Sequence, residues 1–193
     1  MTGRGEQLDP WELLRVLQEH RAMYVVVGAF ARVLHGAPEQ TSGIDIVPWP
    51  RAENLRHLDA ALVELRAVRD DGRYLEPLAS AYPPSEPVVR LRTDFGRLSI
   101  VAEPRGTSGF DDLRRRSEIE NIGHGVRIQV ASASDCLRML AALERPEDAD
   151  RLRLLQRTVE LSSLQREQTR QARQAELERR RGHERDSGLG LER

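Results

Sequence analysis

The sequence predicts a small α+β (α/β-like) domain in which a mixed β-sheet is flanked by helices. Short β-branched segments that end at Gly or Pro alternate with segments whose apolar residues recur at helical spacing. A chain of 193 residues, 39% of them hydrophobic, is long enough for one domain with a buried core and an appendage. We expect strands at residues 23–28, 44–48, 88–93, 97–103 and 126–131.

The first helix is predicted from its N-terminal signature. Asp9 is a good N-cap residue, Pro10 suits the first helical position, and apolar residues then follow at helical spacing. The next segment, MYVVVG, is short and β-branched, which is typical of a buried strand. A helix of two turns is expected over 29–36, where Gly36 ends it.

The middle of the chain predicts a helix followed by a hairpin. The leucines of residues 51–67 fall on one helical stripe. The turn DFG at residues 94–96 is expected to join strands 88–93 and 97–103 into an antiparallel pair.

Two helices are predicted after the last strand. Ser134 is expected to cap the first, which ends before Pro146. The second is very long, and its residues that can dock on the core are Leu152, Leu155, Val159 and Leu164. Beyond Gln165 too few apolar residues remain for packing, which leaves a solvated helix, a partner-binding arm or a frayed end as alternatives. The predicted divisions are a domain over 1–150, a polar helix over 151–182 whose first part is docked, and a disordered tail over 183–193.

The charge of the chain is nearly balanced, but its cations are unusual. The net charge of −1 does not by itself require a nucleic-acid partner. All 30 cationic residues are Arg, which excludes any mechanism that needs a Lys ammonium group. Residues 151–193 carry 11 Arg and 7 acidic residues, so the C-terminal helix could contact RNA phosphates or a protein partner, or expose a solvated face.

The sequence has no feature of export or membrane insertion. The N-terminal MTGRGEQLDP lacks the apolar core of a signal peptide, and no apolar stretch is long enough to span a membrane. Cys136 is the single cysteine and cannot form an internal disulfide, which fits a reducing compartment. We therefore expect a cytoplasmic protein.

The segment VVVGAFARVLHGAPEQTSGIDIVP (25–48) resembles the opening of the nucleotidyltransferase superfamily. It is most similar to the minimal nucleotidyltransferases and to the nucleotidyltransferase toxins of type IV toxin–antitoxin and abortive-infection systems. The matching positions are Gly28, Ala31, His35, Gly36, Thr41 and Asp45. Downstream, LRTDFGRLSIVAEPRGTSGFDDLRRR and VASASDCLRMLAALERPEDADRLRLL resemble the family's aspartate hairpin and closing helices. The resemblance covers residues 10–155 and implies the nucleotidyltransferase fold, a nucleoside triphosphate as ligand and Mg²⁺ as cofactor.

The chemistry of nucleotidyl transfer explains why that family carries three aspartates. Two Mg²⁺ ions hold the attacking and leaving oxygens of the α-phosphoryl group, and Mg²⁺ prefers oxygen ligands in octahedral geometry. Two aspartates spaced Asp-x-Asp on a strand point to the same side, so both can reach the ion pair. A third aspartate on the neighbouring strand completes the cage, and a basic side chain from the closing helices neutralises the triphosphate.

This sequence departs from the family pattern at each of those positions. The resemblance places Gly43 at the first aspartate, Ser99 at the third and Leu140 at the basic residue. Glu39 stands at the family's loop Arg, which reverses the charge expected to face a nucleotide. Asp45 is the one metal-site aspartate that is retained, so we expect Mg²⁺ to bind weakly or not at all.

Residues of the glycine loop and the short helix keep more than one interpretation. Gly28, Thr41 and Ser42 are candidate nucleotide contacts, although the two hydroxyls could equally be ordinary loop groups. His35 could close the short helix and hydrogen-bond the loop, or act as a base.

Four charged residues downstream also have open roles. Asp94 could approach a relocated ion or serve its own turn. Arg138 lies about 200° around the helix from position 140 and is expected to face away from the site. Arg145 and Asp148 could contact a partner or brace the helix junction.

Together these observations predict a pseudoenzyme: a nucleotidyltransferase-fold protein with a degenerate metal site that binds a nucleotide, RNA or a protein partner. The alternative is an active, toxin-type transferase with an unorthodox site built on Asp45. Such an enzyme would move a nucleotide from a triphosphate to RNA, protein or a small acceptor.

Overall fold

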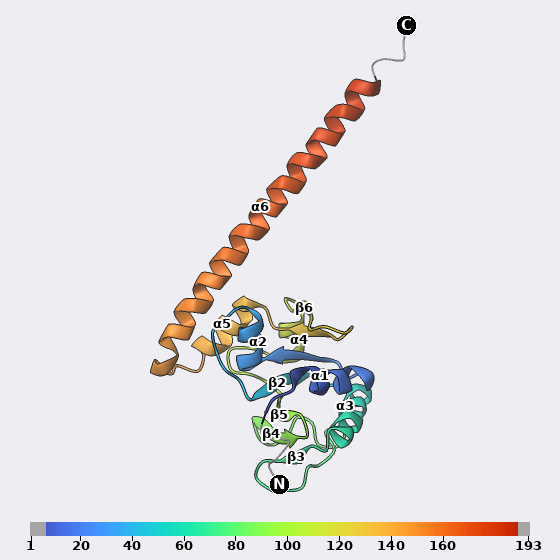
Figure 1. Ribbon diagram of the computed structural model, residues 1–193, viewed down its shortest axis with the longest axis vertical. Coiled ribbons are helices and arrows are strands. Elements are labelled where there is room, and N and C mark those ends of the chain that lie inside the picture. The colour runs from blue at the N-terminus through green and yellow to red at the C-terminus, as the bar shows by residue number, and fades with distance from the viewer. Residues whose placement is uncertain (1–6, 189–193) are drawn as a thin grey trace.

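The computed structural model, in which residues 7–188 are described, contains one seven-stranded mixed sheet in the order β3-β4-β5-β2-β1-β7-β6 (Figure 1). The strands are β1 (Tyr24–Val27), β2 (Gly43–Pro48), β3 (Val68–Arg69), β4 (Val88–Thr93), β5 (Gly96–Val101), β6 (Glu118–Asn121) and β7 (Arg127–Val130). The helices are α1 (Pro10–Glu19), α2 (Gly28–Leu34), α3 (Ala52–Glu64), α4 (Phe110–Arg114), α5 (Ala133–Ala141) and α6 (Ala149–Gly188), with a 3-10 turn at Pro146–Asp148. The expectation of a small mixed sheet flanked by helices is confirmed.

The strands at the centre of the sheet set the geometry of the site. β2 runs antiparallel to β1 and parallel to β5, and β4 closes a hairpin with β5 as the sequence predicts. All four residues of β1 are buried, so both faces of the sheet are covered there. α1 packs against α3, while α2 packs against α5. Apolar side chains of the sheet and of these helices form a single core.

The predicted start of α1 is confirmed in detail. The Asp9 carboxylate accepts a hydrogen bond from the Glu12 N–H at 3.1 Å, and Pro10 occupies the first turn. The predicted cap of α5 is wrong by two residues, because the Ser132 hydroxyl, and not that of Ser134, accepts the Asp135 N–H. Ser134 is the second residue of the helix, whereas Ser132 precedes it and lies three residues before an orphan donor.

The sequence did not predict two of the strands, β3 and β6. β3 has only two residues, and β6 has the sequence EIEN, whose charged residues are untypical of a strand. Both are edge strands, where short length and charge are common because they discourage pairing with other chains. The helix expected over 51–67 is also shorter, since α3 ends at Glu64.

Helix α6 leaves the domain as a single arm, as Figure 1 shows. Its first turns pack on α5, and Leu155 is buried there while Leu152 and Val159 are half-buried. Leu164 is 55% exposed, so its predicted docking on the core is wrong. The helix continues to Gly188, past the predicted end at 182, and the remaining tail positions 189–193 lie outside the described residues.

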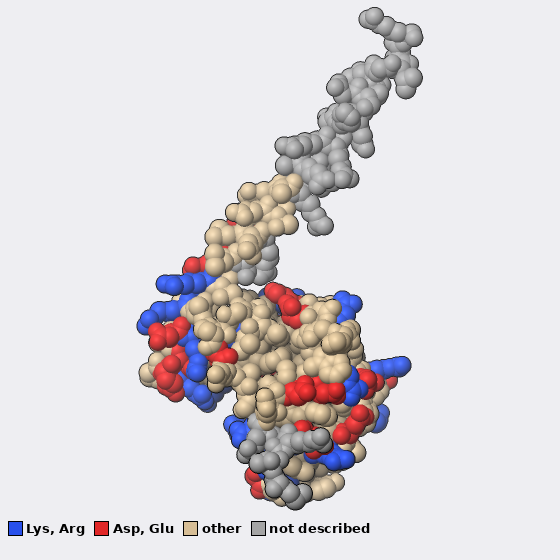
Figure 2. Space-filling view, in the orientation of Figure 1, with Lys and Arg blue, Asp and Glu red and all other residues tan. Residues whose placement is uncertain are grey.

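The surface of the domain is mixed in charge. Figure 2 shows acidic and basic side chains interspersed on the face in view, with no large area of one sign. This pattern agrees with the net charge of −1. Within the described part of the chain, no helix is long and apolar enough to cross a membrane.

Candidate functional site

A row of three polar side chains crosses the middle of the sheet. Asp45 on β2 is in register with Ser99 on β5, and Ser99 is in register with Arg90 on β4. Residues in register on adjacent strands project from the same face. A carboxylate, a hydroxyl and a guanidinium therefore follow one another across three strands, while Ile44 and Ile46 are buried on the opposite face.

The Asp45 carboxylate lies directly against the backbone of Gly28, where β1 turns into α2. A Cβ placed on Gly28 would be 2.0 Å from the Asp45 Oδ2 atom, and the residue has a φ of +70°. Both the close approach and the left-handed backbone require glycine at this position. The glycine turn thus fixes where the carboxylate can lie.

The electrostatic surroundings of Asp45 are those of a partly buried acid among cations. Burial raises the pKa of the Asp45 carboxyl above its ordinary value. A hydrogen bond from the Ser99 hydroxyl and the charges of Arg32 and Arg90 oppose that effect without cancelling it. Ionisation of Asp45 is therefore more costly in this site than in water.

Gly43, two residues before Asp45 on β2, has no room for a side chain. A Cβ built there would be 2.8 Å from the Cβ of Arg97 and 2.9 Å from the Arg97 carbonyl oxygen. The backbones of β2 and β5 approach each other closely at this pair, which only a glycine permits. The packing of the two strands accordingly excludes an acidic side chain at this position.

Asp45 opens into a cavity with a volume of about 370 Å³. One part of its wall is apolar and includes Val27, Val88, Val101, Met139, Leu140 and Leu143. Its charged lining residues are Arg32, Asp45, Glu103, Arg105 and Arg145. Such a mixture of an apolar wall with a few charged groups is typical of a small-molecule site.

The cations of this cavity differ in their availability. The Arg32 guanidinium donates two hydrogen bonds of 2.7 Å to the Glu39 carboxylate and is neutralised by it. Arg105 and Arg145 are exposed, and neither takes part in an ion pair with another described residue. Two uncompensated guanidinium groups thus face a cavity that holds two acids.

Two solved structures share this arrangement of strands and helices. A proposed nucleotidyltransferase from Thermotoga maritima is 19% identical, with a TM-score of 0.50 over 77% of this chain and 94% of its own. The antibiotic-resistance factor ANT(2'')-Ia is 15% identical, with a TM-score of 0.53 over 90% of this chain and 95% of its own. This chain has the nucleotidyltransferase fold.

Identities this low establish the fold and nothing finer. No protein-family model and no curated protein matches the sequence. The resemblance drawn from segment 25–48 is confirmed at the level of the nucleotidyltransferase fold. Its narrower likeness to toxins of toxin–antitoxin systems stays a prediction.

The nucleotidyltransferase fold brings Gly28, Asp45 and Leu140 to one cavity. Leu140 is buried and contributes an apolar wall where the resemblance placed a basic residue. Thr41 and Ser42 are not among the lining residues. The Thr41 hydroxyl donates to the Gly43 carbonyl oxygen at 2.7 Å and accepts from the Gly43 N–H, so it closes its own loop. A nucleotide contact by Thr41 or Ser42 stays a prediction.

Glu39 does not line the cavity at Asp45, so the expectation that it faces a nucleotide is not supported. Its carboxylate pairs with Arg32 and lies 3.6 Å from the Arg151 guanidinium. Arg151 also reaches the buried Asp148 at 2.5 Å. This chain of charges links α2, the loop before β2 and the start of α6, which supports the bracing role considered for Asp148.

The other uncertain residues have structural partners. The His35 Nε2 atom lies 2.8 Å from the Ala131 carbonyl oxygen and joins α2 to the start of α5. Arg138 pairs with Asp112 and Asp135 away from the cavity, as expected. The carboxylate of Asp94, in the turn between β4 and β5, lies 3.5 Å from the guanidinium of Arg66. Asp94 does not line the cavity.

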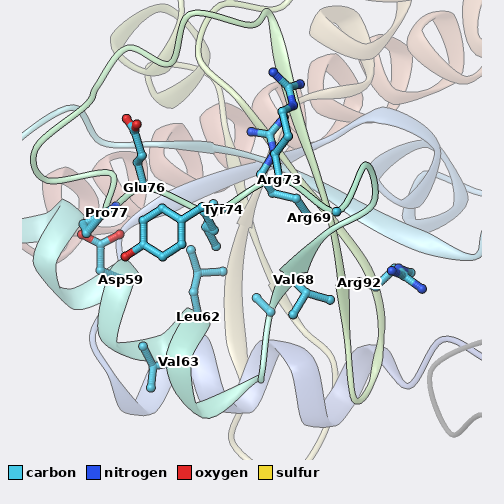
Figure 3. A pocket seen from close by; sticks show the side chains of 13 residues that line it. Asp59, Leu62, Val63, Val68, Arg69, Arg73, Tyr74, Glu76, Pro77 and Arg92 are labelled. Carbon is cyan, nitrogen blue, oxygen red and sulfur yellow. The ribbon is translucent and has the colours of Figure 1, made fainter.

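A second cavity, with a volume of about 500 Å³, lies between α3, β3 and the loop that follows β3 (Figure 3). Its arginines are all neutralised by neighbouring acids: Arg69 and Arg73 by Asp71 and Glu86, and Arg92 by Asp70. The Asp59 carboxylate accepts the N–H groups of Leu78 and Ala79. This cavity offers an anionic ligand no free cation, which distinguishes it from the cavity at Asp45.

The donor set of the cavity at Asp45 does not fit Mg²⁺. The cavity has two carboxylates, those of Asp45 and Glu103, and the polar row adds one hydroxyl and the cation Arg90. Nowhere in the described residues do three or more His, Cys, Asp or Glu side chains form a group that could hold a metal ion. A divalent cation here would meet few anionic ligands and the repulsion of a guanidinium.

Sequence reasoning missed Arg90 as a member of the polar row, although the signal for it was available. The hairpin turn pairs Thr93 with Gly96, and that register alone places Arg90 opposite Ser99. Arg32, Glu103 and Arg105 were also missed as lining residues, because they come from separate segments that only the tertiary fold brings together.

We expect Asp45→Asn to stabilise the protein at neutral pH. Because burial raises the pKa of Asp45, the ionised carboxylate costs stability above its folded-state pKa, and this cost disappears as the pH falls below the unfolded-state pKa. A change of about 1 kcal/mol moves Tm by roughly 2–4 °C in a chain of this size, so thermal unfolding can detect the effect. The variant should melt above the wild type at neutral pH and converge with it in acid. Equal Tm values at neutral pH would contradict the electrostatic account.

Proposed function

We propose that this protein binds a nucleotide in the cavity at Asp45 and does not transfer it. The fold supports a nucleotide as the ligand class, since it is shared with nucleotidyltransferases. The cavity volume of about 370 Å³ is in the range of small-molecule sites. Its apolar wall suits the base and sugar, and its free arginines suit the phosphates.

One observation carries the second half of the proposal: Asp45 is followed across the sheet by a hydroxyl and a cation instead of further carboxylates. Transfer of a nucleotidyl group by two-metal chemistry needs anionic oxygens that hold both ions in place. The position of Gly43 supports the same reading, because the packing of Arg97 against it leaves no space for a second aspartate.

Titration calorimetry tests the binding half of the proposal. Each of the four nucleoside triphosphates is titrated into the full chain, and we expect saturable heat with at least one of them. The second cavity serves as an internal control, because changing Arg73 there should leave the affinity unaltered. No heat with any triphosphate would overturn the proposed function.

Incubation with α-labelled triphosphates tests the absence of transfer. Total tRNA, protein and small hydroxyl or amino compounds are offered as acceptors, and we expect no label above the level without protein. The competing function is the active, toxin-type transferase built on Asp45. Label transfer that disappears in Asp45→Ala would establish that function and overturn ours.

A further inference from the structure

We propose that Arg90, Arg105 and Arg145 receive the phosphates of the bound nucleotide in the place of divalent cations, so that binding is independent of metal. This inference rests on the proposed function and adds the means by which the site recognises its ligand.

The three guanidinium groups come from separate parts of the fold: two line the cavity at Asp45, and the third belongs to the polar row of the sheet beside it. Arg105 lies in the loop after β5, and Arg145 lies at the junction between α5 and the 3-10 turn, and both line the cavity at Asp45. Arg90 is on β4, where Val88, two residues earlier and on the same face, also lines the cavity. The positive charge of Arg90 acts on Asp45, which places it in the electrostatic field of the site.

These three arginines are available to a ligand, whereas most arginines near the two cavities are not. Arg32 is held by Glu39, and every arginine of the second cavity is held by an acid. No ion pair in the described part of the chain involves Arg90, Arg105 or Arg145, and all three are exposed. A guanidinium remains charged at all relevant pH values and matches a phosphate with two parallel N–H donors.

The charge balance of the site favours an anion over a metal–anion complex. Arg90, Arg105 and Arg145 supply three positive charges near Asp45 and Glu103. In the metal-dependent arrangement a carboxylate cage attracts cations, and these attract the phosphates. Here the positive charge is covalently part of the chain, so an ionised Asp45 opposes the binding of phosphate instead of supporting it.

The effect of Asp45 separates the two mechanisms. If a metal ion mediates binding, Asp45→Asn removes its ligand and weakens affinity. If the arginines bind the phosphates directly, the same change removes a repulsive charge, and we expect affinity to increase several-fold. The Asn side chain is close in size to Asp and keeps an acceptor for the Ser99 hydroxyl, so the cavity should retain its shape.

The experiment measures the affinity of the full chain for ADP by titration calorimetry, in EDTA and in Mg²⁺. We expect similar Kd values in the two buffers. Arg105→Gln, Arg145→Gln and Arg90→Gln should each weaken binding about tenfold, the effect of losing one charge-assisted hydrogen bond. Arg56→Gln, an exposed arginine of α3 without an ion pair in the described structure, is the matched control and should change Kd less than about twofold.

Adenosine, which has no phosphate, is the matched ligand control. Its affinity should be lower than that of ADP and should not respond to the three arginine substitutions. Because these arginines are exposed, thermal unfolding should place each variant close to the wild type, so a loss of affinity cannot be a loss of folding.

Each outcome decides between the proposals. Binding of ADP only in the presence of Mg²⁺, or a loss of affinity in Asp45→Asn, would overturn metal-independent phosphate binding by the three arginines. Either result would leave the proposed nucleotide binding intact. Binding in EDTA that none of the three arginine variants weakens would also overturn only the role of the arginines. No binding of any nucleotide in either buffer would overturn the proposed function and this inference together.

Discussion

Replacing Glu39 by Met is expected to lower the free energy of unfolding by about 2 kcal/mol, because the change leaves the half-buried Arg32 guanidinium without its partner. The Arg32 side chain is 13% exposed and that of Glu39 is 9% exposed. Two hydrogen bonds of 2.7 Å join them, so each charged group is stabilised by the other in place of the water that it has lost. Chemical denaturation of the variant and the wild type measures the difference.

The double variant Arg32→Met with Glu39→Met is the control for this prediction. Removing both charges from a buried pair is often close to neutral, so the double variant should recover most of the lost stability. If the double variant is as unstable as Glu39→Met, the loss comes from packing and not from the unpaired guanidinium.

The pH dependence of stability provides a second signature of the same pair. The hydrogen bond from Arg32 lowers the pKa of Glu39 below its ordinary value. The native state therefore releases the proton of Glu39 at lower pH than the unfolded chain does, and the resulting stability is present above the unfolded-state pKa and lost as the pH falls through the folded-state pKa. Glu39→Met should remove this part of the acid transition.

Introducing a second aspartate on β2 with Gly43→Asp is expected to destabilise the fold by roughly 2 kcal/mol and to create no transferase activity. The new Cβ would be 2.8 Å from the Arg97 Cβ, so β2 and β5 must separate at the point where they pair. That separation would also displace Asp45 from Ser99, which lies two residues along each strand. Thermal unfolding and the α-label assay measure the two effects.

The smaller substitution Gly43→Ala separates the causes of this effect. If close backbone approach dominates, Ala should destabilise the protein nearly as much as Asp, because the clash arises at the Cβ itself. A stable Gly43→Asp variant that transfers label would show that the site is one substitution from activity, against our proposal.

The sequence was sufficient for most of the fold because its local signals agree with one another. The cap at Asp9, the β-branched strand β1 and the hairpin turn before Gly96 are each decided by neighbouring residues. β3 and β6 could not be found in this way, because an edge strand is stabilised by pairing with its neighbour rather than by its own composition.

The candidate site was predictable where the motif is continuous and not where the cavity is assembled from distant segments. Gly28 and Asp45 lie within one short motif, and the structure places them in contact. Whether Glu39 faces a ligand or a guanidinium depends on the position of Arg32, which the sequence pattern does not specify. The closure of the space beside Gly43 depends on the distance between two backbones, which no residue pattern encodes.

The 40 residues of α6 form a helix about 60 Å long, which separates most arginines of residues 151–193 from those at the cavity. The backbone positions beyond Gln165 lie roughly 25–60 Å along the helix axis from its first turn, whereas the Debye length in physiological salt is about 8 Å. Screening therefore disconnects the arm from the field inside the domain (Figure 1). A charge bound or lost on the far part of the arm therefore leaves unchanged the potential that a small anion meets at the sheet.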